Sequence, residues 1–401
     1  MADRVVLHVG TPKTGTSAVQ DALFNRRDQL AKQEVLYPGD RFDAHFLAAL
    51  DLMELPWGGL EQQSAGAWDR LADEVRDWSG TAIISHEILG RASRLQAARA
   101  LESLGGSGAE MHVVVSARDL ARQLPAEWQE NVKHRRTLTY HEFLDRIRDP
   151  ERSAEISQWF WSVQEVPDVL ARWADTLPPD RVHVVTVPPS GSDPDLLARR
   201  FADALGLAEI PSDGSRSNVS LGVAESALVR RLNERLDMVL PNHHYREFVR
   251  ELLVHRNLSL RRESPRLTVP EEVHDWTVEL GRQWADELAA RQYAVVGDLD
   301  DLVPAPQQLA FADPDAPDEA EVAAAGVRAL AASVTENARL RDVEAELRGV
   351  VDDLRGQLDA VYSTRAYRIK QRLVASADHN PVARAGLGGY RLLRGRSSRS
   401  A

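Results

Sequence analysis

Short apolar runs alternate with helical patterns along residues 4–189 of the chain. Residues 4–9 form a β-branched run that ends at Gly10, and apolar residues then recur at helical spacing from Gly15 to about Gln33. Further apolar runs follow at residues 34–40, 81–89, 111–120 and 181–189. Strands that alternate with helices favour a parallel sheet covered on both faces. We therefore expect an α/β fold, a three-layer sandwich with a central parallel sheet, whose ligand lies beyond the carboxyl ends of the strands.

Composition argues against several classes of protein. The 401 residues carry a formal net charge of -12, whereas nucleic-acid-binding proteins usually have a basic balance. The chain contains no cysteine, which excludes disulfides and thiolate metal sites. The N-terminus lacks the apolar region and cleavage site of a signal peptide, and no stretch approaches the roughly 18 apolar residues of a membrane span. We therefore expect a cytoplasmic protein that does not bind nucleic acid.

The composition divides the chain into four segments. We predict an α/β domain at residues 1–302, a linker rich in Pro, Ala and acids at 303–328, a heptad helix at 329–362 and a basic tail at 363–401. Apolar residues of the third segment recur at steps of three and four, and continue after one stutter: Leu340, Val343, Leu347, Val350, Leu354, Leu358 and Val361. About three heptads are marginal alone but able to pair, so we expect a weak homodimer through residues 340–361.

The basic tail has two interpretations. From Arg365 onward the chain has nine basic residues and a single acid, Asp378. The simpler interpretation is a solubilising or disordered end, and the alternative is contact with an acidic surface or a membrane. Both remain open from the sequence.

The loop that follows the first strand is suited to hold an anion. Residues 10–17 read GTPKTGTS, and glycines let the backbone approach a ligand closely. The following helix offers unpaired N–H groups. Lysine is rare in this chain and occurs only at positions 13, 32, 133 and 370. Lys13 is therefore unlikely to lie in such a loop by chance.

A nucleoside triphosphate loop would need a different arrangement. In that motif, G-x-x-x-x-G-K-[ST], lysine follows the second glycine, but here Thr16 follows Gly15. No aspartate ends a candidate strand as a magnesium ligand would, and the third apolar run contains Glu87 instead. The loop keeps the anion cradle without the lysine–metal pairing of polyphosphate transfer. One bridging phosphate beside a sulfuryl group carries fewer charges than a triphosphate. One lysine and several N–H donors are therefore enough to neutralise it without a metal.

The stretch TPKTGTS resembles the 5′-phosphosulfate loop of the sulfotransferases, which usually reads P-K-[ST]-G-[ST]-[ST]. These enzymes use 3′-phosphoadenosine 5′-phosphosulfate (PAPS), and their fold is P-loop-like. The resemblance covers roughly residues 1–300 and implies no metal. It implies that PAPS is held by Thr11, Pro12, Lys13, Thr14, Gly15, Thr16 and Ser17. The alternative is a strand–turn–helix loop without a ligand.

A second motif of the same family, the 3′-phosphate site, is present in part. Arg118 and Asp119 follow an apolar run as the family requires, but Leu120 replaces the usual proline. Ala126 replaces the family's serine and cannot donate a hydrogen bond, while Trp128 stands where tyrosine is common. If a helix begins after Pro125, Arg122 and Gln129 are substitute donors. Arg118 is alternatively a surface ion-pair residue, and Trp128 is as well explained by core packing as by adenine stacking.

A third family feature is a loop between two helices that closes over the adenine and the 3′-phosphate. Here Arg216, Asn218 and Ser220 precede a helix expected to start near Val223. This correspondence is weak, and the alternative is an ordinary capping loop. Elsewhere, His243, His244 and His255 lack the spacing of a metal site. The aromatic residues of 158–164 suit core packing better than stacking on a sugar.

A hydroxyl acceptor needs a base to take its proton. Family bases are commonly His or Glu near the end of the second strand, which makes His45 the first candidate, with Asp43 next and Asp40 behind it. His45 suits neutral pH, although it could instead cap the following helix. Glu87, beside His86 at the end of the next run, is the competing base. The resemblance implies that Lys13 stabilises the bridging oxygen as the S–O bond breaks.

We therefore expect a sulfotransferase that moves a sulfuryl group from PAPS to a hydroxyl or amine of an unidentified acceptor, such as a carbohydrate, a natural product or a peptide. One alternative is a sulfotransferase-like nucleotide-binding protein that has lost its chemistry, because Leu120 and Ala126 depart from the family motif. The less favoured alternative is a P-loop kinase, which would need lysine at position 16 and a magnesium carboxylate.

Overall fold

The computed structural model describes residues 2–106, 108–210, 220–236, 239–260 and 264–377, together with Val382 and Ala385. These residues belong to two compact units, Met1–Ala329 and Leu330–Ala401. The first unit contains the sheet and the helices around it. The second unit is helical in its described part.

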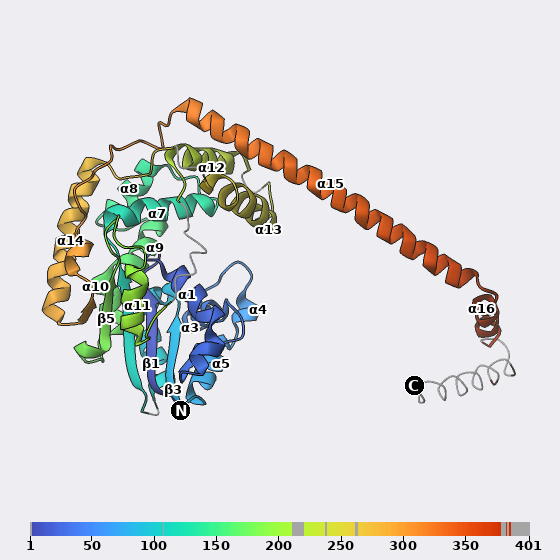
Figure 1. Ribbon diagram of the computed structural model, residues 1–401, viewed down its shortest axis with the longest axis horizontal. Coiled ribbons are helices and arrows are strands. Elements are labelled where there is room, and N and C mark those ends of the chain that lie inside the picture. The colour runs from blue at the N-terminus through green and yellow to red at the C-terminus, as the bar shows by residue number, and fades with distance from the viewer. Residues whose placement is uncertain are drawn as a thin grey trace. The chain divides into compact units, whose positions relative to one another are not determined.

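The first unit is built on one parallel sheet of six strands in the order β2-β3-β1-β4-β5-β6 (Figure 1). This confirms the predicted α/β fold with a central parallel sheet. In the register of the sheet, His8 of β1 lies opposite Ser85 of β3. The strands are β1 (Ala2–Gly10), β2 (Val35–Leu36), β3 (Gly80–Ser85), β4 (Glu110–Ala117), β5 (Val182–Thr186) and β6 (Ala294–Val296).

Helices cover both faces of this sheet. The first-unit α-helices are α1 (Thr16–Asn25), α2 (Arg27–Ala31), α3 (Ala44–Met53), α4 (Glu61–Ser64), α5 (Ala67–Arg76), α6 (Arg94–Gly105), α7 (Leu120–Lys133), α8 (Tyr140–Arg148), α9 (Glu155–Gln164), α10 (Val166–Trp173), α11 (Leu196–Leu205), α12 (Val223–Leu236), α13 (Asn242–His244) and α14 (Glu271–Arg291). Short 3-10 turns are η1 (Glu87–Arg91), η2 (Pro179–Arg181), η4 (Leu258–Leu260) and η5 (Leu299–Leu302), and η3 (Tyr245–His255) is a π-helix.

Alternate residues of each strand enter different cores. Val6 and Ile83 pack with residues of α1, α2 and α11 in one apolar cluster. Val5, Leu7 and Ile84 point the other way, into a larger cluster that includes residues of α3, α5, α6, α7 and α10. Side chains alternate across a strand with period two. The near-continuous apolar runs of the sequence therefore reflect a sheet buried on both faces.

Three details differ from the sequence expectation. The second run gives only the two residues Val35–Leu36 as strand, because Pro38 lacks the N–H that would continue the ladder. The third run ends as a strand at Ser85, and Glu87 begins a 3-10 turn instead. The three-residue strand β6 follows α14 at the edge of the sheet and is too short to give a periodic signal.

The segment predicted as a linker packs on the first unit. Phe311 lies 6.5 Å from Tyr140 between ring centroids, and Val322 is buried in a cluster with Ala224 and Ala227 of α12. Ala325 is fully buried. A composition rich in Pro, Ala and acids is typical of linkers, but these few apolar residues are enough to anchor the segment. The helix α15 (Glu319–Ser363) accordingly begins inside the first unit, earlier than the predicted residue 329.

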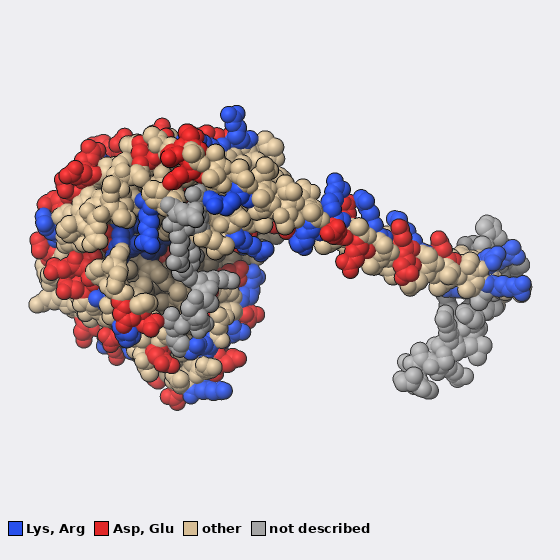
Figure 2. All heavy atoms as spheres, turned by 45° about the horizontal axis from the view of Figure 1, so that its top comes forward, with Lys and Arg blue, Asp and Glu red and all other residues tan. Residues whose placement is uncertain are grey.

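The second unit contains the rest of α15 and α16 (Arg365–Ala377). The predicted apolar stripe is helical, and its residues Leu340 to Leu354 expose between 37% and 59% of their surface. Whether this stripe pairs stays a prediction. Figure 2 shows acidic and basic side chains alternating along α15 and basic ones gathered at α16. Among the helices that the structure describes, none combines the length and the apolar character needed to cross a membrane.

Candidate functional site

The loop of residues 10–17 connects β1 to α1 at the carboxyl end of the sheet. Gly15 is the N-cap of α1, with φ 85°, and no side chain of the described residues caps this helix by a hydrogen bond. A Cβ at this position would lie 2.6 Å from Leu197 Cδ2, in a backbone conformation that favours glycine. The first N–H groups of α1 are thus available to an anion at the loop.

Two threonines fix the shape of the loop from within. The N–H and the hydroxyl of Thr11 donate to the carbonyl of Ser116 at 2.8 and 3.1 Å, and the hydroxyl of Thr14 donates to the carbonyl of Thr11 at 2.6 Å. Both threonines are buried, as is Thr16, whereas Ser17 is exposed. Thr11 and Thr14 therefore tie the loop to β4, and their hydroxyls are already engaged.

His8 lies in a buried polar network behind this loop. Its Nδ1 is 2.7 Å from Ser85 Oγ and its Nε2 is 3.2 Å from Ser116 Oγ, while Thr14 Oγ1 is 2.6 Å from the same Ser116 hydroxyl. Burial lowers the pKa of His8 to about 4, so it is neutral at pH 7. His8 is not among the site residues predicted from the sequence. The available signal was a histidine within the apolar run VVLHVG.

Lys13 forms an ion pair that was not predicted. Its Nζ lies 2.9 Å from Oε2 of Glu130, a residue of α7, and the two side chains are 31% and 25% exposed. Lys133, His134 and Arg250 also approach the Glu130 carboxylate, at 3.7, 3.0 and 3.9 Å. Burial alone would raise the pKa of Glu130, but the hydrogen bond from His134 and the charges of Lys13 and Lys133 hold it well below its usual range.

Arg118 follows β4, as the sequence predicted, and its guanidinium also reaches the loop, which was not predicted. Its Nη1 donates to the carbonyl of Lys13 at 3.1 Å. Its Nε is buried and has no hydrogen-bond partner among the described residues. Burial, followed by the nearby charge of Arg122, lowers the pKa of Arg118 to about 10. An anion bonded to this guanidinium would satisfy the buried donor.

The substitute donors expected after Pro125 are engaged elsewhere. Helix α7 begins at Leu120, before Pro125, and Asp119 caps it by accepting from the N–H of Arg122 at 2.9 Å. The guanidinium of Arg122 pairs with Asp119 and donates to the carbonyl of Pro188 at 2.8 Å. The side-chain amide of Gln129 is buried and donates to the carbonyl of Leu221 at 2.7 Å. In this conformation neither residue replaces the missing serine hydroxyl.

Trp128 belongs to the core. It is fully buried, its Nε1 donates to the carbonyl of Leu138 at 3.0 Å, and its ring lies 4.9 Å from that of Tyr140. A ring enclosed in this way has no face open to an adenine base. This corrects the expectation that Trp128 contacts the nucleotide, and it favours the alternative of core packing.

The structure disfavours His45 as the catalytic base. His45 is 4% exposed; its Nδ1 accepts from the N–H of Ser85 at 3.1 Å, and its Nε2 donates to the carbonyl of Pro38 at 2.9 Å. Burial lowers its pKa to about 4. Both ring nitrogens therefore join segments of the fold, which corrects the preference for His45. Asp43 pairs with Arg41 at 2.8 Å on the exposed side of this segment.

Glu87 is the better placed carboxylate. It begins the 3-10 turn after β3, and its Oε2 accepts from Gln20 Nε2 of α1 at 2.8 Å. Burial would raise its pKa, but the charge of His86 and the hydrogen bond from Gln20 outweigh burial and leave the pKa below the usual value. Glu87 is thus ionised at neutral pH and able to accept a proton.

Aromatic side chains extend from the end of β3. The ring of His86 lies 5.1 Å from Phe46, Phe46 lies 5.6 Å from Trp57, and Trp57 lies 5.7 Å from Trp159. The guanidinium of Arg91 covers the ring of Trp159 at 4.3 Å. Each of these five residues is partly exposed. Within residues 158–164, Phe160 and Trp161 are buried in the core, as predicted, whereas Trp159 is partly exposed.

Two expected nucleotide contacts, Arg216 and Asn218, lie outside the described residues. Ser220 is exposed, and α12 starts at Val223 as predicted.

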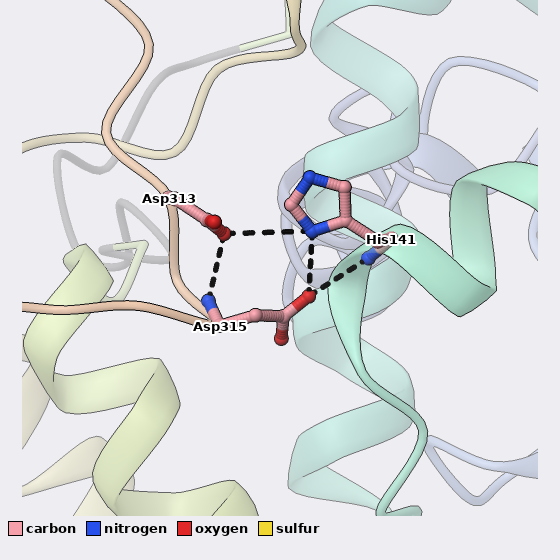
Figure 3. A group of neighbouring side chains, drawn as sticks. All are labelled: His141, Asp313 and Asp315. Carbon is pink, nitrogen blue, oxygen red and sulfur yellow. Dashed lines mark hydrogen bonds and ion pairs between the residues drawn. The ribbon is translucent and has the colours of Figure 1, made fainter.

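One group of described residues has ligand atoms close enough for a metal ion: His141, Asp313 and Asp315 (Figure 3). Asp315 accepts from the N–H groups of Tyr140 and His141 at 3.0 and 2.9 Å, and its Oδ2 lies 2.9 Å from Nδ1 of His141. This hydrogen bond is the main cause that raises the pKa of His141. The group fastens the segment before α15 to the start of α8.

No family model, curated protein or solved structure matches this chain.

Proposed function

We propose that the protein is a sulfotransferase, which transfers a sulfuryl group from PAPS to a hydroxyl or amine of an acceptor. The observation that carries the proposal is the convergence of Lys13 and Arg118 on one glycine-flanked loop, where Arg118 donates to the Lys13 carbonyl at 3.1 Å. A full cation and helix N–H groups there suit one phosphosulfate group. Thr16 stands where a nucleoside triphosphate loop would have lysine.

The donor would be held by the loop and by Arg118. Residues 12–17 surround the phosphosulfate, and the buried Nε of Arg118, unpaired among the described residues, is a donor for the 3′-phosphate. Ala126 supplies no hydroxyl in the family's serine position. PAPS contributes the activated sulfuryl group, and the protein orients it and offsets the charge that develops on the leaving nucleotide.

Glu87 takes the part of the base in this proposal. The acceptor oxygen forms a bond to sulfur while the bond between sulfur and the bridging oxygen breaks, and the acceptor proton passes to the Glu87 carboxylate. Lys13 offsets the negative charge that the departing 3′,5′-ADP (PAP) carries away. A positioned base contributes about 10²–10⁴ in rate. Glu87 follows β3, the strand next to β1, so that its carboxylate and the loop belong to neighbouring carboxyl ends of the sheet.

The acceptor side is formed by partly exposed aromatic residues. Phe46, Trp57, His86 and Trp159 lie in one series beyond β3, with Arg91 on the ring of Trp159. Rings of this kind suit an acceptor that itself contains a ring, such as a carbohydrate or an aromatic natural product.

Calorimetry with PAP, PAPS, and ATP with magnesium separates this function from its alternatives, and an assay of PAP release with a panel of sugars and phenols then measures turnover. We expect PAP and PAPS to bind and ATP to bind weakly. Preference for ATP with magnesium would favour a P-loop kinase. PAP binding with no turnover of any acceptor would favour a nucleotide-binding protein that has lost its chemistry, for which the departures at Leu120 and Ala126 are the argument.

A further inference from the structure

Four basic side chains surround the single carboxylate of Glu130. Lys13 comes from the loop, Lys133 and His134 from the end of α7, and Arg250 from the π-helix η3. Lys133 and His134 lie within one helical turn of Glu130, whereas the fold brings Lys13 and Arg250 to the same carboxylate from distant parts of the sequence. We call Lys13, Glu130, Lys133 and Arg250 the Glu130 cluster. His134, whose side chain is more exposed, also forms a hydrogen bond with Glu130.

The cluster has more positive than negative charge. Lys13, Lys133 and Arg250 share Glu130 as their only salt-bridge partner within the described ranges. Lys133 is 8% exposed, and its pKa is lowered by burial and by the charges of Lys13 and Arg250, although Glu130 raises it. Nearby Glu127 accepts a hydrogen bond from Gln164 and has its pKa raised by burial, so it adds at most a second negative charge against the three positive ones. Excess positive charge on these partly buried side chains is unfavourable and favours the binding of an anion.

Arg250 gives a second and independent indication. Its Nε is buried and has no hydrogen-bond partner among the residues that the structure describes. Arg250 lies on an eleven-residue π-helix, a rare form that is frequent at functional sites. Burial is the main cause that lowers the pKa of His255. The positive charges of Lys133 and Arg250 lower it further, while the negative charges of Glu251 and Glu130 raise it. The positive potential thus extends from the loop to η3.

We propose that Lys133 and Arg250 of the Glu130 cluster bind an anionic group of the acceptor, a carboxylate, phosphate or sulfate ester, and that Glu130 is the internal counter-ion which this group displaces. The assignment of the anion to the acceptor rests on the proposed sulfotransferase function. Displacement of Glu130 by the acceptor's anion also frees Lys13 for the phosphosulfate. Binding of the correct acceptor is thereby coupled to the charge stabilisation that transfer requires.

Inorganic phosphate is the probe, and the full chain is titrated with and without saturating PAP. Phosphate that binds the folded protein raises its unfolding temperature in a concentration-dependent way. With PAP in the loop, we expect phosphate still to bind, and Lys133→Gln and Arg250→Gln each to weaken it at least tenfold while PAP affinity changes less than threefold. Glu130→Gln should tighten phosphate several-fold. Arg246→Gln and Glu247→Gln, exposed on the same π-helix, are the matched controls.

Three outcomes would overturn the proposal. The first is that phosphate binds equally to wild type, Lys133→Gln and Arg250→Gln. The second is that PAP saturation abolishes phosphate binding and both variants lose PAP affinity, since the cluster would then hold the donor. The third is that Glu130→Gln weakens phosphate. Lys133→Arg should bind phosphate as wild type does, which separates lost charge from a failure to fold. If PAP does not bind at all, the proposed function fails, and the titration without PAP still tests the cluster.

Discussion

His45 should control how the stability of the first unit depends on pH. Its neutral ring accepts a hydrogen bond from the N–H of Ser85 and donates one to the carbonyl of Pro38. A protonated ring could not accept the bond from Ser85, and its charge would be buried. Burial therefore lowers the pKa of His45 from 6.5 to about 4. His8, in the network behind the loop, has its pKa lowered to about 4 for the same reason.

The sign and size of the effect follow from these values. The unfolded chain takes up the proton near pH 6.5 and the folded chain only near pH 4, so the stability is complete above pH 6.5 and is lost as the pH falls toward 4. When the pH falls from 7.5 to 5, one such histidine should lower the free energy of unfolding by about 2 kcal/mol, because one pKa unit corresponds to about 1.4 kcal/mol. His8 and His45 together should cost about twice that.

The measurement is urea unfolding of wild type and His45→Gln between pH 5 and pH 8, followed by tryptophan fluorescence. All nine tryptophans lie before residue 330, so the signal reports the first unit alone. We expect His45→Gln to be less stable at pH 8 and the difference from wild type to narrow by about 2 kcal/mol at pH 5. A difference that stays constant across this range would refute the buried neutral histidine.

The same variant decides the role of His45 in the proposed reaction. We expect His45→Gln to lower the transfer rate only a few-fold at pH 8, because both ring nitrogens are used in the fold. Glu87→Gln should lower the rate by about 10²–10⁴ and leave PAP affinity nearly unchanged. If His45→Gln abolishes turnover in folded protein and Glu87→Gln does not, the base is His45.

Further predictions concern the donor site. Lys13→Ala should lower turnover by about 10²–10³ in a PAP-release assay with the fold intact, and retention of more than a third of the rate would contradict its role. Arg118→Ala should weaken PAP more than adenosine 5′-phosphosulfate in calorimetry, because only PAP carries the 3′-phosphate; equal losses would place Arg118 elsewhere. Ala126→Ser should be tolerated and should tighten PAP several-fold by restoring a donor, whereas insoluble protein would show that the position is closely packed.

The sheet and the loop could be predicted because their signals are local. A short run such as MHVVVSA, rich in valine, is typical of a strand buried on both faces of a sheet, and Gly10 with Gly15 marks the turn of the loop. The two-residue strand β2 and the docking of residues 303–328 gave no such signal. Docking depends on a few contacts, such as Phe311 against Tyr140, that local composition does not indicate.

The partners of the site residues could not be predicted, because each lies far along the chain. Lys13 meets Glu130 across more than a hundred residues, and nothing in the sequence around either residue announces the pair. The burial of Trp128 and the two backbone bonds of His45 are likewise set by tertiary packing. A histidine near a strand end has the same sequence pattern whether its nitrogens face a substrate or two backbone groups.

Two shortened chains test where the catalytic unit ends. A chain of residues 1–303 would lose Phe311 from Tyr140, the Asp315 contacts to the start of α8, and buried Val322 and Ala325. Loss of one helix cap lowers the free energy of unfolding by about 1 kcal/mol, and loss of each buried apolar side chain lowers it by a comparable amount. We therefore expect the free energy of unfolding of the 1–303 chain to be lower by a few kcal/mol.

A chain of residues 1–337 keeps those contacts and should match the full chain in unfolding free energy and in transfer rate per folded molecule. It lacks the exposed apolar stripe that begins at Leu340, and apolar residues at heptad spacing pair in two-stranded coils. Light scattering should therefore show dimers of the full chain at high concentration and monomers of the shortened one. Leu347→Asp in the full chain should also give monomers, because pairing of the stripe would bury the charge of the new aspartate. If light scattering shows monomers for all three proteins, the stripe does not pair with a second copy of the chain. If the 1–303 chain has the same free energy of unfolding as the full chain, residues 303–328 are a linker.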